Sequence, residues 1–228
     1  MELPDELIYD IIIKSDTDAI ENLCFANTRI QQLCNNRQLW VNKFNSDGLQ
    51  VFTIQTSAAQ WIQEYKKVSK IAEKVDNLFV LINNELYKQN ISSGRVLLQI
   101  VFHFNEDLVA LLPQELSNNI KEDLKQVNIE DTYSQIIFIS IEHKTYTIEY
   151  DLYDENGDDV ISEHLITSQN DIRNFIIAIL YNYPLMDIAD FNGLSYFYDK
   201  LKSQVKLCRM SRGRWEQLKS RLTFWESI

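Results

Sequence analysis

The sequence predicts an α+β fold, in which three short N-terminal helices and a long helical connector precede a small, mainly antiparallel sheet covered by helices. Three observations support this fold class. Apolar residues recur at helical spacing from the N-terminus to about residue 86. Alternating apolar runs, which are typical of strands, follow between residues 95 and 166. The 228 residues include only five Gly and three Pro, which favours regular elements over long loops.

The N-terminal helices are predicted from helix starts and apolar stripes. Pro4 suits the first position of a helix, where its missing N–H is not needed. Asp18 is expected to cap the second helix, with Glu21 completing a capping box, and a third helix is expected to start near residue 27. The first helix should carry its apolar side chains on one side, at Leu7, Ile8, Ile11 and Ile12.

Three helices of two or three turns bury too little surface to be stable alone. The cysteines, Cys24, Cys34 and Cys208, are odd in number and lack metal-ligand spacing, and two of them occupy apolar helical positions. We therefore expect buried free thiols in a reducing compartment, and no covalent staple. The N-terminal helices should complete their core on another surface, either a partner protein or the rest of the chain.

The opening residues resemble an F-box across about residues 2–46. The resemblance lies in an ordered set of motifs: Leu3-Pro4-Asp5-Glu6-Leu7, Ile11-Ile12, Asp18…Ile20…Leu23, Phe25-Ala26-Asn27-Thr28-Arg29-Ile30, Leu39-Trp40 and Phe44, followed by Trp61…Tyr65-Lys66. The chain departs from the family pattern at Ile30, where an aromatic residue is usual, and at Cys24, where Val or Leu is common. Both changes reduce the apolar area that is available for docking.

The resemblance implies a substrate-recruiting adaptor of a cullin-RING ubiquitin ligase, which docks on a Skp-family adaptor and presents a target protein through its C-terminal part. The residues expected to dock are Leu3, Pro4, Leu7, Ile8, Ile11, Leu23, Asn27, Leu33, Leu39 and Trp40. A minimal N-terminal F-box joined to a domain without familiar repeats also resembles proteins that large DNA viruses of protists or insects use to redirect host ubiquitination. The alternative is a structural or regulatory binding protein whose F-box-like segment packs internally.

A long helical pattern follows from residue 56 to residue 86. Its apolar residues step by three or four, and neither Gly nor Pro interrupts it before Gly94. The pattern fits one stiff helix that would hold the distal domain in place. It fits equally well two core helices separated by a break near residues 66–67 or 73–74.

The C-terminal part is expected to contain strands and helices in sequence. A strand over residues 95–104 precedes helices over 108–112 and from Pro113, and strands follow at 134–142, 146–153 and 160–166. Further helices are expected after residue 167, after Asn192-Gly193 and around Trp215. We therefore divide the chain into a docking module at 1–46, a helical connector at 47–92 and an α+β partner-binding or substrate-binding domain at 93–228.

No pattern in the sequence indicates catalysis. The three histidines have no ligand spacing, and phosphate-loop, nucleophile-elbow and zinc-protease motifs do not occur. The acidic stretch around Gly157 does not fit a calcium loop, because the residue that would have to be Asp at the first position is Leu152. We expect no catalytic residue, no cofactor and no metal.

The charge and hydropathy of the chain limit which partners and compartments are expected. The net charge of −11 disfavours nucleic acid and anionic membranes as general partners. The longest apolar run, residues 175–181, is too short to span a bilayer, and the acidic opening is not that of a signal peptide, so a cytoplasmic or nuclear protein is expected. A basic C-terminal stretch contains Arg212, Arg214, Trp215 and Arg221. It either partly faces the acidic residues 149–163, or is simply a solvated helix face, or receives an acidic protein or a nucleic acid.

Overall fold

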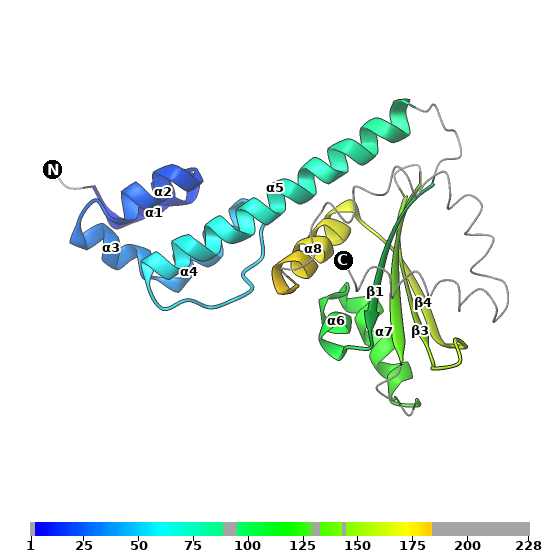
Figure 1. Ribbon diagram of the computed structural model, residues 1–228. Helices are drawn as coiled ribbons and strands as arrows, with labels where there is room; N and C mark the ends of the chain where they lie inside the picture. Colours follow the sequence, from blue (N-terminus) through cyan, green and yellow to red (C-terminus); the bar gives the residue numbers. More distant parts are fainter. Residues whose placement is uncertain (1–2, 89–94, 128, 130–132, 143–144, 184–228) are drawn as a thin grey trace, which may run out of the picture. The chain divides into compact units, whose positions relative to one another are not determined.

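The computed structural model describes residues 3–88, 95–127, 129, 133–142 and 145–183. The chain divides into two compact units, which are described separately below. Among the described residues, those up to 79 and those at 176–183 form the first unit, and those from 80 to 175 form the second. Figure 1 labels the elements along the chain.

Four short helices open the first unit, where the sequence predicted three. They are α1 (Asp5–Lys14), α2 (Thr17–Cys24), α3 (Thr28–Cys34) and α4 (Arg37–Ser46). Helix α1 packs against α3 and α4, and α3 also packs against α2 and α4. The additional helix, α4, contains the Leu39-Trp40 pair of the F-box-like motif set.

Side-chain caps set the starts of these helices. Asn27 caps α3, because its Oδ1 accepts a hydrogen bond of 2.9 Å from the Ile30 N–H. Asp16 caps α2 by accepting from the Ala19 N–H at 2.8 Å. The prediction that Asp18 caps this helix is therefore wrong. Asp18 lies inside the first turn, where its charge favours the positive end of the helix dipole.

Helix α5 runs without a break from Ala58 to Lys88. The two-helix alternative is therefore excluded, as expected for 31 residues that contain neither Gly nor Pro. Its part within the first unit buries residues at helical spacing, namely Trp61, Tyr65, Val68, Ala72, Val75 and Phe79. This buried stripe supplies a large share of the core of the first unit.

The last turns of helix α8 (Gln169–Asn182) also belong to the first unit. Tyr181 is their anchor: its ring stacks on Phe52 with centroids 4.4 Å apart, and its hydroxyl lies 2.8 Å from Thr53 Oγ1. The ammonium group of Lys67 lies 3.5 Å from the centroid of the same ring. Burial is the main cause of the raised pKa of Tyr181, which keeps the hydroxyl protonated.

The second unit is built on a four-stranded antiparallel sheet, which confirms the α+β class. Its strands are β1 (Arg95–His103), β2 (Ser134–Glu142), β3 (Thr145–Tyr153) and β4 (Asp159–Thr167), in the order β1-β2-β3-β4. The register pairs apolar residues across the strands, for example Ile139 with Ile148 and Leu152 with Ile161.

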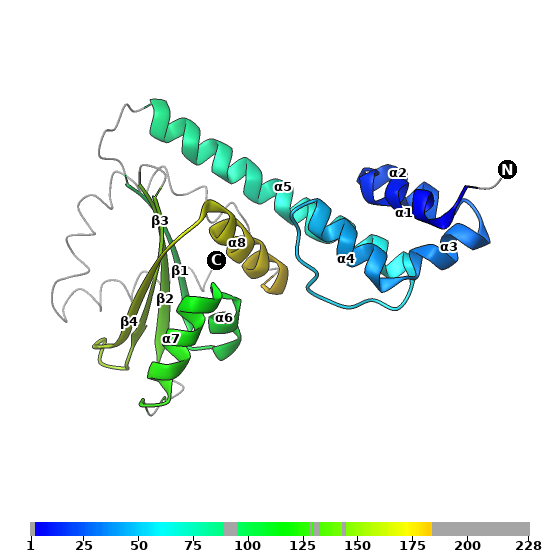
Figure 2. The same cartoon turned by 180° about the vertical axis from the view of Figure 1, so that it is seen from behind.

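Helices cover one face of this sheet. Helices α6 (Glu106–Leu111) and α7 (Gln114–Leu124) lie on the same side of the strands in both views (Figures 1 and 2), and α7 packs against β4. Alternate residues of β3 are buried, namely Tyr146, Ile148, Tyr150 and Leu152. Within this core, the Tyr150 hydroxyl donates to Gln135 Oε1 at 3.2 Å, so that two buried polar side chains pair with each other.

Carboxylates organise the turns at the ends of strand β4. Asp154 accepts from the backbone N–H groups of Asn156 and Asp158, and these bonds, Asp158 first, lower its pKa. Gly157 has a positive φ of 78°, a conformation that glycine adopts without strain in the turn between β3 and β4. At the start of α8, Asp171 accepts from the hydroxyls of Ser168 and Thr167, which lower its pKa.

Within the described residues, no helix combines the length and apolar character needed to cross a bilayer.

Candidate functional site

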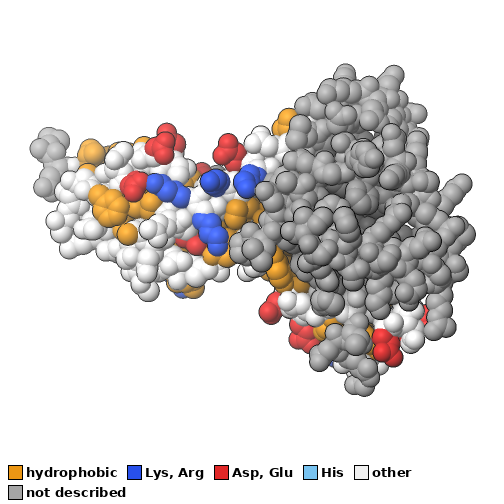
Figure 3. All heavy atoms as spheres, viewed as in Figure 1, with side chains coloured by type: hydrophobic (Ala, Val, Ile, Leu, Met, Phe, Trp, Pro, Cys, Tyr) orange, Lys and Arg blue, Asp and Glu red, His pale blue; other side chains and the backbone are white. Residues whose placement is uncertain are grey.

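An exposed apolar stripe marks the first helix. Leu3, Leu7 and Ile11 step by four residues and are 52%, 50% and 43% exposed. We call these three residues the docking stripe. Leu7 and Ile11 are four residues apart and lie on the same side of α1, whereas Leu3 directly precedes the N-cap, Pro4. Figure 3 shows hydrophobic side chains open to view on this part of the molecule.

An arginine from α3 holds the entry into α1. The Arg29 guanidinium donates to the Leu3 carbonyl at 2.9 Å and to Asp5 Oδ1 at 2.5 Å. Both groups belong to the residues at the start of α1, beside the first member of the docking stripe. Arg29 therefore links the position of the docking stripe to the position of α3.

Helices α4 and α5 together form a closed aromatic core. Trp40 stacks on Trp61 with centroids 6.0 Å apart and planes 8° apart, and Phe44 meets the edge of Tyr65 at 5.5 Å. We call these four residues the aromatic cluster. All four are at most 4% exposed, as is the neighbouring Leu39. The cluster joins α4 to α5 and gives the short helices the cover that they cannot provide for one another.

The predicted docking residues are therefore divided between surface and interior. Pro4 and Asn27 are exposed in addition to the docking stripe, while Leu23 and Leu33 are half-buried. Ile8, Leu39 and Trp40 are buried and offer little surface to a partner. The predicted acidic-partner residues, Arg212, Arg214, Trp215 and Arg221, lie outside the described residues.

A buried lysine closes the C-terminal end of α1. Lys43 Nζ donates to the carbonyls of Ile13 at 2.9 Å and Ser15 at 2.7 Å, and pairs with Asp47 Oδ2 at 2.8 Å. The Tyr65 hydroxyl donates to the same carboxylate oxygen at 2.5 Å. Desolvation and then this bond to Asp47 raise the pKa of Tyr65. The buried cation thus satisfies carbonyl groups that the end of a helix leaves without intrahelical partners.

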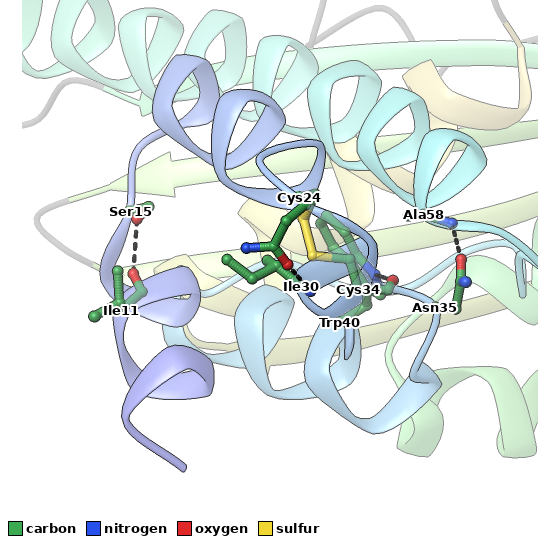
Figure 4. Close-up of a disulfide and its surroundings, with 9 residues drawn as sticks. Ile11, Ser15, Cys24, Ile30, Cys34, Asn35, Trp40 and Ala58 are labelled. Carbon is green, nitrogen blue, oxygen red and sulfur yellow. Dashed lines mark hydrogen bonds between the residues drawn. A yellow bond between two sulfur atoms is a disulfide. The ribbon is translucent and has the colours of Figure 1, made fainter. Parts of the chain in front are cut away.

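Cys24 and Cys34 form a disulfide, so the prediction of free buried thiols is wrong for this pair. Their Cα atoms are 5.7 Å apart, and both residues are fully buried (Figure 4). The bond joins the last residue of α2 to the last residue of α3. The odd number of cysteines in the sequence argued against a disulfide and so concealed the pair. The third cysteine, Cys208, lies outside the described residues. The useful signal was that both cysteines occupied apolar positions at the ends of neighbouring short helices.

Sequence reasoning also left Phe25 out of the site, although it is part of the motif. Phe25 directly follows α2 and is 46% exposed, which makes it comparable to the members of the docking stripe. Its place between two helices, rather than on a helical stripe, concealed it from a search based on periodicity. Phe25 thus adds a fourth large apolar side chain to the exposed surface of the N-terminal helices.

None of the family models, curated proteins or solved structures compared with the chain matches it. The site is therefore defined by its own geometry. Within the part of the chain that the structure describes, no group of three or more His, Cys, Asp or Glu side chains is placed to hold a metal ion. The docking stripe and Phe25 form an exposed apolar surface on helices that are cross-linked by a disulfide. Such a surface suits binding of another protein.

Proposed function

We propose that the chain is a substrate-recruiting adaptor of a cullin-RING ubiquitin ligase, and that its docking stripe binds a Skp-family adaptor. The exposure of Leu3, Leu7 and Ile11 carries this proposal. These residues belong to the stretch that resembles an F-box. They stay about half exposed, although α1, which contains Leu7 and Ile11, buries Ile8 and Ile12 on its other side.

Burial of the docking stripe by a partner would contribute to binding. Full burial of a Leu or Ile side chain contributes roughly 1.5–3 kcal/mol. Because each of the three is about half exposed, a partner would gain about 1 kcal/mol from each. Phe25 adds a comparable amount if the same partner reaches it. Such a contribution favours a specific contact and is compatible with a folded free chain.

The proposed mechanism is proximity rather than bond chemistry. The N-terminal helices attach the chain to the ligase, and the second unit presents a target protein. Holding a target lysine near a charged ubiquitin carrier raises its effective concentration, without any catalytic residue in this chain. The target binds a surface of the second unit that the resemblance does not identify.

The experiment is a binding measurement between the full chain and a purified Skp-family adaptor. Leu7→Ser with Ile11→Ser, and separately Leu3→Ala with Pro4→Ala, should abolish binding while the circular dichroism spectrum stays unchanged. Ile54→Ser is the matched control, because Ile54 is 57% exposed but lies outside the stripe. Absence of binding by the unmodified chain, or equal binding by all variants, would refute the proposal.

The second candidate is a structural or regulatory binding protein without ligase association. The burial of Leu39 and Trp40 against α5 favours it, because part of the expected docking set is already covered by the chain itself. This candidate predicts a stable, folded chain that binds no Skp-family adaptor at any concentration. The same binding measurement therefore separates the two candidates.

A further inference from the structure

The Cys24–Cys34 disulfide links two of the N-terminal helices, α2 and α3, covalently. It closes a loop of ten residue steps and holds the ends of α2 and α3 together. Outside this bond, α2 has few ties to the other short helices: its main helix contact is with α3. Glu21, on α2, also pairs with Lys66 on α5 at the surface. Surface ion pairs of this kind contribute little, so the disulfide and the fully buried Ile20 are the main restraints on α2.

The residues beside the bond connect it to the rest of the unit. The Cys34 carbonyl accepts a hydrogen bond of 2.7 Å from Trp40 Nε1, which is buried in the aromatic cluster. The next residue, Asn35, accepts from the Ala58 N–H at 2.7 Å, at the first residue of α5 (Figure 4). The end of α3 is therefore fixed on one side by α4 and α5, and the disulfide transfers this restraint to α2.

The same helix reaches the docking stripe from its other end. Arg29, in the first turn of α3, binds the Leu3 carbonyl and the Asp5 carboxylate. Phe25 lies directly after Cys24, in the connector that the disulfide closes. A shift or a loss of order in α2 and α3 would therefore change the positions of both the docking stripe and Phe25.

We propose that Cys24 and Cys34 form a redox-sensitive cross-link that keeps the docking stripe and Phe25 in a binding-competent arrangement. In the reductive step, the thiolate of an external thiol attacks one cysteine sulfur and breaks the S–S bond, which leaves a mixed disulfide and one free thiolate. A second external thiolate then attacks the sulfur of the first reductant in the mixed disulfide and releases the protein cysteine as a thiolate. Two protons are taken up, the two cysteines become thiols, and the two reductant thiols become a disulfide.

Burial decides how this reaction can occur. Both cysteines are fully buried, so an external thiolate cannot reach either sulfur in the closed fold. Reduction must pass through an opened state of α2 and α3, which makes the cross-link slow to respond and resistant to brief exposure to reductant. A thiol-rich compartment would then convert the pair over time, because such compartments keep accessible cysteines reduced.

The expected effect follows from loop closure. Removing a cross-link that closes a loop of this size should favour the open state of the joined helices by about 100-fold. A partner that needs the closed arrangement then binds less well, in proportion to the fraction of chains that remain competent. The loss of docking rests on the proposed function, whereas the loss of protection in α2 and α3 does not.

The experiment uses the full chain carrying Cys208→Ser, so that the buried pair is the only source of thiols. Amide hydrogen exchange is measured before and after complete reduction by dithiothreitol, with thiol alkylation as the check on conversion. Reduction should accelerate exchange of the protected amides of α2 and α3 by about 100-fold, and leave strands β2 and β3 unchanged. Equal exchange in the two states would overturn the proposal.

A chain that also carries Cys24→Ala and Cys34→Ala is the matched control. It should exchange like the reduced protein and show no response to dithiothreitol. If it fails to fold, the reduced Cys208→Ser protein still provides the deciding comparison. A response to dithiothreitol in the folded control would overturn the proposal, because no disulfide within the chain would then account for it.

Binding to a Skp-family adaptor, measured in both redox states, supplies the second readout. Weaker binding after reduction, together with faster exchange, supports the whole proposal. Equal binding in both states overturns the link between the disulfide and docking. If neither state binds the adaptor, the proposed function fails, and the exchange measurement alone decides whether the cross-link is redox-sensitive.

Discussion

The docking stripe at α1 and the aromatic cluster on α4 and α5 have opposite surroundings. Leu3, Leu7 and Ile11 are 43–52% exposed, whereas Trp40 and Phe44 are fully buried. All five belong to the motifs that resemble an F-box. An apolar pattern therefore identifies side chains that need cover, but does not say whether the cover comes from the same chain or from another molecule.

Two features of the chain account for the difference. The continuous helix α5 brings Trp61 and Tyr65 to α4, which gives Trp40 and Phe44 aromatic partners within 6.4 Å. The members of the docking stripe, in contrast, stay about half exposed. The cluster should therefore govern stability and the stripe should govern binding, and substitutions at the two places test this division.

The largest effect is expected for Trp40→Ala. This change removes a fully buried indole, its stacking on Trp61 and its hydrogen bond to the Cys34 carbonyl. We expect a loss of about 4 kcal/mol in the free energy of unfolding, measured by urea denaturation. Trp40→Phe keeps most of the buried apolar area and should lose about half as much. A loss below about 1 kcal/mol for Trp40→Ala would show that the cluster is not the core of this unit.

Lys43→Ala should have the next largest effect. The substitution leaves the carbonyls of Ile13 and Ser15 without their buried donor and Asp47 without its cation. We expect a loss of about 3 kcal/mol, because breaking a buried ion pair leaves its partners unsatisfied. The control is Lys14→Ala, which breaks the exposed pair with Asp10 and should cost less than about 0.5 kcal/mol. Similar losses for the two variants would contradict the role given to burial.

Much of the fold could be predicted from the sequence because its local signals agree. Strands β1 to β4 follow alternating apolar runs, and the structure confirms an antiparallel sheet within an α+β fold. Helix α5 is long because no Gly or Pro interrupts its apolar stripe. These elements depend on periodicity and on helix-breaking residues, and both are visible in a single sequence.

The features that sequence reasoning missed depend on distance in space. The Cys24–Cys34 bond requires the ends of two helices to meet, and the burial of Trp40 requires α5 to return beside α4. Lys43 illustrates the same limit, since a lysine is usually exposed and only its position beside two helix-terminal carbonyls makes burial favourable. Local patterns predicted which residues are apolar or charged, but tertiary packing decides which of them are accessible.

Tyr65→Phe should have a smaller, pH-dependent effect. The phenol hydroxyl donates to Asp47, and its loss should cost about 1 kcal/mol at pH 7. Burial and this bond raise the pKa of Tyr65 above its ordinary value of 10. The stabilisation by the neutral hydroxyl is therefore complete below about pH 10 and is lost as the pH rises through the folded-state pKa.

Urea denaturation of both proteins at pH 7 and above pH 10 tests this prediction. The stability difference between wild type and Tyr65→Phe should shrink at the higher pH. Tyr9→Phe is the control, because its hydroxyl accepts a bond from the exposed side chain of Asn36 rather than serving a buried carboxylate. A difference that stays constant with pH would show that the Tyr65 hydroxyl is not linked to stability.

The smallest effect on stability is expected for Leu7→Ala in the docking stripe. Leu7 is half exposed, so truncation removes little buried area, and alanine is a better helix former than leucine. We expect the free energy of unfolding to change by less than about 0.5 kcal/mol, whereas Leu39→Ala, at a residue only 1% exposed, should lose about 3 kcal/mol. A large loss for Leu7→Ala would mean that the chain itself covers the stripe, and would favour the internally packed alternative over docking.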